Sequence, residues 1–257
     1  MPHLQAEGHR LHYHPAGGGP SGPARGVVVF VHGAGGNGGH WRAQLQGLPP
    51  GWRGLAVDLP GHGDSAGAGC RTMPEYRDVV RAFLRAAGAE RAVLVGHSMG
   101  GGITQAVALA EPALLRGIVL VGTGARLRVH PNIFEVLRRD HAEAARLVAG
   151  WGFGPAAPAA MREEGVRDFL SCPAAVSEAD FHACDGFDVM AEIARIRVPA
   201  LIVCGEQDIL TPTKYARYLY GQIRGSRLVL VPEAGHYVMR EQPAAVNRAL
   251  EGFLADL

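Results

Sequence analysis

The chain has 257 residues, of which 47% are hydrophobic and 19% charged, a balance typical of a folded globular protein and not of a disordered one. Its 25 basic and 24 acidic residues nearly cancel, which argues against a nucleic-acid partner, since such partners call for a strongly basic surface. The four cysteines are widely separated and form no CxxC pair, so the sequence predicts neither a disulfide framework nor a metal site.

The sequence predicts neither a secretion signal nor a membrane-spanning segment. The first ten residues lack the apolar stretch of a signal peptide. The longest apolar runs are about five residues, far short of the roughly 20 that cross a bilayer. We therefore expect a cytoplasmic protein that acts without a membrane.

Short β-branched runs alternate with longer segments of helical period. This alternation is typical of a mostly parallel sheet with helices on both faces, and near-continuous hydrophobicity indicates strands covered on both sides. The predicted strands are 27–31, 55–57, 92–95, 117–121, 200–204 and 228–231, preceded by a weakly alternating edge strand at 11–14. The Gly- and Pro-rich stretch at 17–23 predicts a loop, not a domain linker.

Helices fit the intervals between these strands. The predicted helices are 75–87, 99–110, 212–223 and 243–254. For the third, Thr211 is the expected N-cap, because Pro212 suits the first helical position.

One long segment, from about residue 124 to 196, contains no convincing strand. It carries helical patches at 133–139, 143–148, 159–170 and 177–183, separated by Gly/Pro turns. A structureless loop of that length is uncommon in a compact domain. The sequence thus predicts a core domain formed by 1–123 and 197–257, with 124–196 inserted as a helical cap over one end of the sheet.

The segment Gly96-His97-Ser98-Met99-Gly100 matches the nucleophile elbow, G-x-S-x-G. Five residues alone are a weak signal, but this match follows a predicted strand directly and opens into a helix of small residues. Gly96 and Gly100 provide room for the tight strand-to-helix turn on which such a serine sits. We predict that Ser98 is the nucleophile; the alternative is an incidental serine in a plain turn.

A serine hydroxyl needs a base, and twelve histidines are candidates. His236 follows the predicted strand 228–231 and precedes the last helix, at the end of the sheet where functional loops gather in open α/β folds. The ring of His97 should point away from Ser98 and pack or form a hydrogen bond. His40 and His62 lie in loops near the site. Surface or structural roles are expected for the histidines of the N-terminal edge, and those of the insertion could at most touch substrate: His3, His9, His12 and His14 at the edge, and His130, His141 and His182 in the insertion.

The base in turn needs a carboxylate to orient it. Asp208 follows the strand 200–204, whereas its rival Glu206 lies at the start of the turn, where a structural hydrogen bond is more plausible. The other position available to a triad acid, after the strand 117–121, reads Gly122 to Ala125 and holds no carboxylate. Along the chain these residues follow the order Ser98, Asp208, His236, which is one of the orders in which such triads occur.

A glycine-rich turn follows the strand 27–31, in His32-Gly33-Ala34-Gly35-Gly36. Its main-chain N–H groups can face a bound ester, so we predict that the backbone N–H groups of Ala34 and Met99 form the oxyanion hole. His32 is expected to pin this loop through its ring nitrogens.

These motifs together resemble the α/β-hydrolase superfamily over nearly the whole chain. The residues that carry the resemblance are 32–36, 58–65, 96–101, 205–208 and 235–236. The resemblance implies an eight-stranded, mostly parallel sheet with a helical cap inserted after the sixth strand. It also implies that 58–65 shapes the floor of the site without a catalytic role.

The superfamily hosts several activities, so the fold alone does not fix the function. Members that resemble dehalogenases or epoxide hydrolases carry an aspartate where this chain has Ser98, which argues against both activities. We predict a hydrolase of carboxylic esters with small to medium acyl chains, acting through an acyl-enzyme and requiring no cofactor or metal. Its partner is a small-molecule ester, and the oligomeric state stays open between a monomer and a homodimer.

Two further classes remain as alternatives. A C–C bond hydrolase acting on a vinylogous diketone is suggested by the Gly-rich loop 32–37 followed by Trp41, although no set of carboxylate-binding side chains is evident. A ligand receptor on the same fold is the other, with lactonase, perhydrolase or acyltransferase chemistry as minor variants. Apolar side chains of the insertion form either a pocket roof or the insertion's own core: Ile133, Phe134, Leu137, Trp151, Phe153, Phe169, Phe181 and Phe187.

Overall fold

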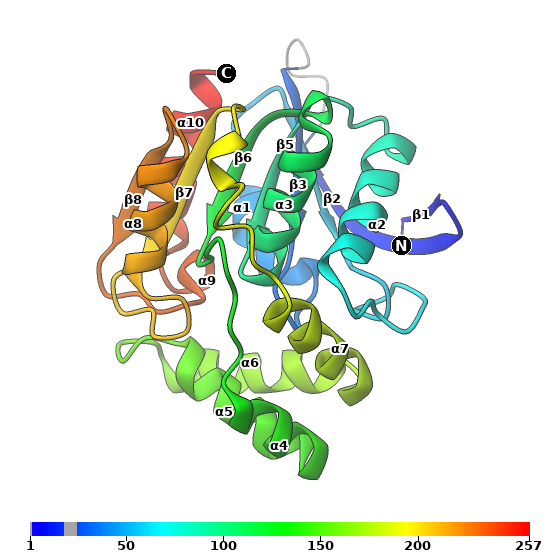
Figure 1. Ribbon diagram of the computed structural model, residues 1–257, viewed down its shortest axis with the longest axis vertical. Helices are drawn as coiled ribbons and strands as arrows, with labels where there is room; N and C mark the ends of the chain where they lie inside the picture. Colours follow the sequence, from blue (N-terminus) through cyan, green and yellow to red (C-terminus); the bar gives the residue numbers. More distant parts are fainter. Residues whose placement is uncertain (1, 18–24) are drawn as a thin grey trace.

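An eight-stranded sheet forms the centre of the molecule (Figure 1), and the computed structural model describes residues 2–17 and 25–257. The strands are ordered β1-β2-β4-β3-β5-β6-β7-β8 across the sheet. The β1–β2 and β2–β4 pairs are antiparallel, and every later pairing is parallel. The strand bounds are β1 His3–Ala6, β2 His9–Gly17, β3 Gly26–Val31, β4 Trp52–Val57, β5 Ala92–His97, β6 Leu115–Val121, β7 Ala200–Gly205 and β8 Arg227–Val231.

Helices cover both faces of this sheet, and the side chains of each strand alternate between them. In β3, Val29 and Val31 pack toward α2, α3 and α8, while Val28 and Phe30 pack toward α1, α9 and α10. These helices are α1 Arg42–Gln46, α2 Met73–Ala86, α3 Met99–Ala110, α8 Thr213–Gln222, α9 Val238–Glu241 and α10 Pro243–Ala255, with short 3-10 turns at Gly38–Trp41, Pro112–Leu114 and Ile193–Arg195. The α/β-hydrolase fold predicted from the sequence is confirmed.

Four helices connect β6 to β7 and lie together below the sheet in Figure 1. They are α4 Pro131–Arg139, α5 His141–Gly152, α6 Ala159–Ser171 and α7 Ala174–Asp185, and we call them the inserted helices. All four fall within the range 124–196 and match the helical patches expected there. The division of the chain into core and cap domains stays a prediction.

The predicted strands and helices are all present, and the differences lie at their ends. Helix α2 begins two residues earlier than expected because Thr72 and Glu75 form a capping box. The N-cap predicted for α8 is wrong: Pro212 occupies that position, and the Thr211 hydroxyl bonds Asp208 instead. The short strand β1 and the short helices α1 and α9 were not expected from the sequence pattern. Of the loop predicted at 17–23, all but Gly17 lies outside the described residues.

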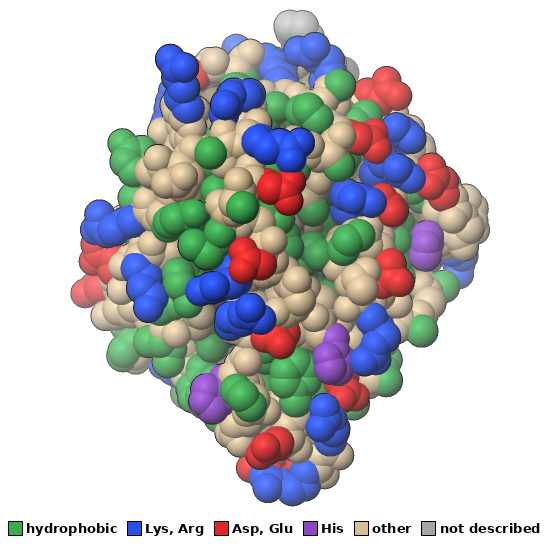
Figure 2. Space-filling view, in the orientation of Figure 1, with side chains coloured by type: hydrophobic (Ala, Val, Ile, Leu, Met, Phe, Trp, Pro, Cys, Tyr) green, Lys and Arg blue, Asp and Glu red, His purple; other side chains and the backbone are tan. Residues whose placement is uncertain are grey.

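On the face drawn in Figure 2, acidic and basic side chains are interspersed, so this face does not indicate a strongly charged partner. Across residues 2–17 and 25–257, no helix has both the length and the apolar character needed to cross a membrane. Location in the cell and oligomeric state stay predictions.

The close approach of α3 to the sheet gives a test of the packing. A Cβ on Gly100 would lie 2.6 Å from the carbonyl oxygen of His32, too close for any real contact, whereas one on Gly252 in α10 would meet nothing. We expect Gly100→Ala to destabilise the fold by about 1–3 kcal/mol through this backbone clash, a magnitude typical of overpacked cores. Gly252→Ala should stabilise it by about 0.5–1 kcal/mol, since alanine favours the helix. Urea unfolding of both variants measures this, and equal stabilities would contradict it.

Candidate active site

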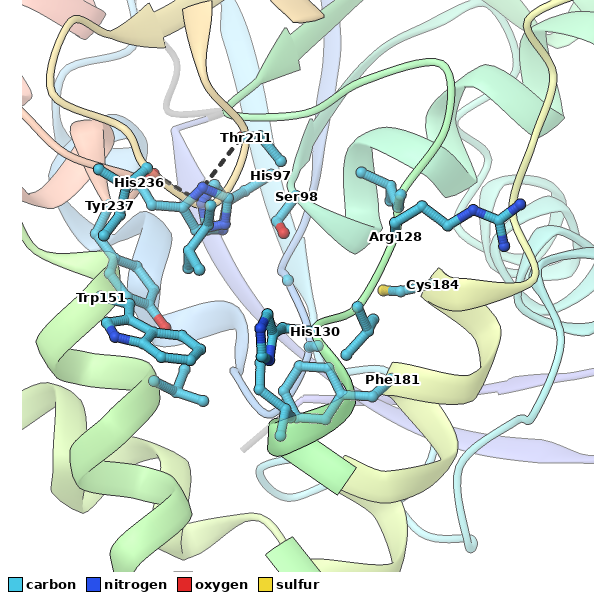
Figure 3. A pocket seen from close by; sticks show the side chains of 18 of the residues that line it. His97, Ser98, Arg128, His130, Trp151, Phe181, Cys184, Thr211, His236 and Tyr237 are labelled. Carbon is cyan, nitrogen blue, oxygen red and sulfur yellow. Dashed lines mark hydrogen bonds between the residues drawn. The ribbon is translucent and has the colours of Figure 1, made fainter. Parts of the chain in front are cut away.

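A cavity of about 340 Å³ lies between the carboxyl ends of the strands and the inserted helices. Its lining is mainly apolar and includes Ser98, Ala34 and His236, which come from three distant parts of the chain. Figure 3 shows the Ser98 hydroxyl pointing into this cavity with the His236 ring beside it. Three of the five sequence-predicted site residues therefore meet at one cavity.

Ser98 sits on a strained turn between β5 and α3. Its backbone has φ +53° and ψ −116°, a region that side-chain-bearing residues rarely adopt. The surrounding backbone holds it there: the Ser98 N–H donates to the Val121 carbonyl at 2.9 Å, and the Ser98 carbonyl accepts the Thr123 hydroxyl at 2.9 Å. The turn lifts the hydroxyl away from the sheet and into the cavity.

Asp208 and His236 form a buried pair. His236 Nδ1 lies 2.9 Å from Asp208 Oδ2, and both residues are only 4% exposed. Asp208 also accepts the backbone N–H groups of Leu210 at 2.9 Å and Thr211 at 2.8 Å. Burial favours the neutral acid, but attraction by His236 and these hydrogen bonds outweigh it and keep the pKa of Asp208 below its ordinary value. Asp208 is thus an ionised acceptor for the imidazole. The alternative acid, Glu206, is exposed and makes no bond to His236.

Thr211 joins this pair, and sequence reasoning missed its role. Its hydroxyl oxygen lies 2.8 Å from Asp208 Oδ2 and 3.2 Å from His236 Nδ1. The hydroxyl donates to the carboxylate and fixes its rotation. The sequence signal pointed to a helix cap because a Thr-Pro pair ordinarily marks a helix start.

The backbone of His236 is fixed from two sides. Its N–H donates to the Gly152 carbonyl of α5 at 2.7 Å, so an inserted helix holds it directly. Its carbonyl accepts His97 Nε2–H at 3.0 Å. The His97 ring packs at 4.7 Å from the His236 ring and also lines the cavity, where burial holds its pKa well below the ordinary value. His97 is a neutral support for His236.

The turn that carries Ala34 is closed by two hydrogen bonds. Gly36 N–H donates to Gly33 O at 3.1 Å, and His32 Nδ1–H donates to the same oxygen at 2.8 Å. The other ring nitrogen of His32 accepts the Leu59 N–H at 3.0 Å, so the ring is neutral and pins the loop as expected. Burial lowers the pKa of His32 to about 3.

The two backbone groups proposed for the oxyanion hole remain available. Ala34 lines the cavity, and Met99 opens α3, whose first N–H groups have no partner within the helix. In the ranges 2–17 and 25–257, neither N–H donates a hydrogen bond to protein.

The sequence also singled out histidines and apolar side chains that could contact substrate, and only some of them lie at the cavity. His40 and His130 line it, whereas His62 lies against Asp180 outside it. Of the apolar side chains in the insertion, Ile133, Trp151 and Phe181 line the cavity, and Phe153, Phe169 and Phe187 are buried elsewhere. The sequence left open whether these side chains form a pocket roof or the insertion's own core, and each alternative holds for some of them.

One group of three metal-ligating side chains occurs in the part of the chain that the structure describes: His12, His14 and Asp58. The Asp58 carboxylate already accepts His12 Nδ1–H at 2.7 Å and the Gly38 N–H at 2.6 Å. None of the three lines the cavity. These bonds tie β2 to the loop after β4, and we assign no metal to the cluster.

Comparison with known proteins identifies the family of this chain. The sequence model described as "Alpha/beta hydrolase family" matches residues 28–249, and the chain belongs to that family. It is similar to 2-succinyl-6-hydroxy-2,4-cyclohexadiene-1-carboxylate synthase of Serratia proteamaculans, at 29% identity over 89% of this chain and 93% of the relative. It is also similar to a pimeloyl-[acyl-carrier protein] methyl ester esterase of Neisseria meningitidis, at 30% identity over 81% of this chain and 86% of the relative.

A solved structure described as a thermophilic esterase superposes with a TM-score of 0.86 at 33% identity, over 99% of this chain and 97% of that one. The chain is therefore an enzyme of the α/β-hydrolase superfamily with esterases among its relatives.

The neutral state of buried His32 predicts a pH dependence of stability. Below about pH 6.5 the unfolded chain takes up a proton on this ring that the folded chain, with its pKa of about 3, does not, so stability falls as pH falls. We expect the stability advantage of the parent over His32→Gln to shrink by about 1.4 kcal/mol between pH 7.5 and 5.5. Urea unfolding at both pH values measures this, and a constant difference would contradict it.

Proposed function

We propose that the protein is a serine hydrolase that cleaves carboxylic esters of small to medium acyl chain through an acyl-enzyme. Ser98 is the nucleophile, His236 the base and Asp208 its orienting acid, with the N–H groups of Ala34 and Met99 as oxyanion donors. The observation that carries the proposal is the buried Asp208–His236 hydrogen bond of 2.9 Å beside the strained Ser98 turn in one cavity.

The hydrogen-bond partners determine the protonation of the base. Asp208 is an ionised acceptor, so His236 carries its proton on Nδ1 and leaves Nε2 free to take the Ser98 proton. Ser98 Oγ then bonds to the ester carbonyl carbon, and the carbonyl electrons move to the oxygen. Asp208 stabilises the imidazolium that forms.

The developing oxyanion lies at the start of α3, where two N–H groups and the positive end of a 12-residue helix face it. Collapse of the tetrahedral intermediate breaks the ester C–O bond, and His236 gives its proton to the departing alcohol oxygen. Water then attacks the Ser98 ester with His236 again as base, which releases the acid and restores Ser98.

The cavity favours a modest substrate. Its volume of about 340 Å³ is near the lower end of the roughly 300–1,000 Å³ of small-molecule sites. Ile133, Val148 and Trp151 give it an apolar wall, suited to a short alkyl or aryl group. We propose that residues 124–196 act as a cap that excludes water from this space.

A second candidate, C–C bond hydrolysis, is favoured by one observation. Arg128 is the only Arg or Lys in the cavity lining among the described residues, and a cation there suits a substrate with a carboxylate. The Arg128 side chain is exposed, and its Nη1 donates to the Asp185 carbonyl at 3.1 Å. The guanidinium is thus partly engaged elsewhere, which leaves ester hydrolysis the better supported function.

Removal of the Ser98 hydroxyl tests the nucleophile. Ser98→Ala should fold like the parent, because that hydroxyl holds no structural bond, and it should lose at least 10³-fold in kcat on p-nitrophenyl acetate and butyrate. Ser226→Ala, which removes an exposed hydroxyl, is the matched control and should be unchanged. A Ser98→Ala rate within tenfold of the parent, or no ester turnover by the folded parent, would contradict the proposal. Cleavage of a dienone acid in place of esters would favour the second candidate.

Replacement of the carboxylate tests the orienting acid. Asp208→Asn presents an amide N–H or a neutral oxygen to His236, so the imidazole is held in the wrong tautomer and kcat should fall about 10⁴-fold. Glu206→Gln is the control, since Glu206 is exposed on the same turn and should stay within twofold of the parent. A large loss in the control with a small loss in Asp208→Asn would reassign the acid.

A further inference from the structure

A carboxylate on an inserted helix reaches the turn that carries the proposed oxyanion donor. Asp180 of α7 is fully buried, and its Oδ2 accepts the Gly35 N–H at 2.8 Å, across 145 positions of sequence. The same oxygen accepts His62 Nε2–H at 2.8 Å, and Oδ1 accepts the Tyr76 hydroxyl. Neither the Ser98 chemistry nor the Asp208–His236 pair uses this carboxylate.

His62 balances the charge of Asp180. Its Nε2 faces the Asp180 carboxylate and its Nδ1 faces the Pro60 carbonyl at 3.0 Å, so both ring nitrogens meet acceptors and both carry protons. Burial alone would lower the pKa of His62, but attraction by Asp180 and its hydrogen bond raise that pKa well above the ordinary value. The pair is thus a buried imidazolium–carboxylate that adds no net charge beside a developing oxyanion.

The bond to Gly35 fixes one peptide of the turn. Gly35 has φ +64°, and its N–H points outward to Asp180 while Ala34, one residue earlier, lines the cavity. The ring of Phe169 in α6 packs on the same turn, since a Cβ on Gly35 would lie 2.6 Å from it. The peptide between Ala34 and Gly35 therefore cannot rotate without losing a buried charge-assisted hydrogen bond.

We propose that Asp180 is a positioning residue for the oxyanion hole: by holding the Gly35 N–H it fixes the peptide on the carboxyl side of Ala34, and together with the bonds to the Gly33 carbonyl on the other side it keeps the Ala34 N–H directed at the ester carbonyl. The inserted helices then supply part of the transition-state site and not only its cover. A buried ion pair adds little net stability over apolar packing, so stability alone does not account for this one. The assignment rests on the proposed function, because it takes Ala34 as an oxyanion donor.

Kinetics of variants in this network test the assignment. Asp180→Ala removes the acceptor of the Gly35 N–H. Removal of a whole oxyanion donor lowers kcat by about 10²–10³-fold, so a displaced donor should lower kcat by about 10- to 100-fold. KM for p-nitrophenyl butyrate should stay within threefold. The dissociation constant of phenylboronic acid, which forms a tetrahedral adduct with an active-site serine, should rise about tenfold or more. The double variant His62→Leu/Asp180→Leu replaces the pair by apolar side chains, which is often neutral for folding, and should show the same kinetic loss.

Tyr76→Phe is the matched control. It removes a donor from Asp180 Oδ1 in the same buried network but leaves the bond to Gly35 in place. Its melting temperature should fall, while kcat and phenylboronic acid binding should stay within threefold of the parent. Equal kinetic losses in Tyr76→Phe and the Asp180 variants, or kcat within threefold of the parent in the double variant, would overturn the assignment.

Amide exchange at Gly35, followed by NMR with ¹⁵N-glycine, separates this assignment from the proposed function. Exchange should be slow in the parent, at least tenfold faster in the double variant, and unchanged in Tyr76→Phe. Absence of ester turnover by the parent would refute the proposed function without touching this readout. Fast Gly35 exchange in the parent would refute the Asp180 assignment even in an active esterase.

Discussion

The candidate site depends on parallel strand pairing. Strands β3, β5, β7 and β8 run in the same direction, so their carboxyl ends meet at one edge of the sheet. Ala34, Ser98, Asp208 and His236 each follow one of these ends, although they are spread over some 200 positions of sequence. The sheet is buried on both faces, and its rigidity is what allows groups on four separate loops to hold a fixed arrangement.

The inserted helices are bonded to the loops at this edge in at least three places. The Gly152 carbonyl of α5 holds the N–H of His236, and Asp180 of α7 holds the N–H of Gly35. Arg240 of α9 adds a third tie through its 2.8 Å contact with Asp168 of α6. Loops from the sheet would be free to move in solvent, but these bonds connect them to a second layer of structure.

Local sequence was sufficient for the residues whose position follows from a strand. The sequence could place Ser98, Asp208 and His236 at one edge of the sheet because a strand ends just before each, and it could place His32 beside the glycine-rich turn. Local sequence was insufficient where a role depends on distant partners. Thr211 reads as a helix cap until Asp208 is placed beside it, and Asp180 reads as an ordinary helix residue until the fold brings Gly35 within 2.8 Å.

Local sequence is also insufficient to predict which side chains line the cavity. Helical period identifies the apolar side of the inserted helices, but whether a side chain such as Phe169 or Phe181 faces the cavity depends on how the helices pack against one another. The strand β1 was not predicted because four residues are too few to show a clear alternating pattern.

The bond between His236 N–H and the Gly152 carbonyl has a consequence for how this enzyme meets its substrate. If α5 moved away from the sheet as a rigid unit, this hydrogen bond would move the loop that carries the imidazole with it. The His236 ring would then no longer lie beside Asp208. On the proposed function, a state in which α5 had moved away together with this loop would lack an aligned base and would be inactive.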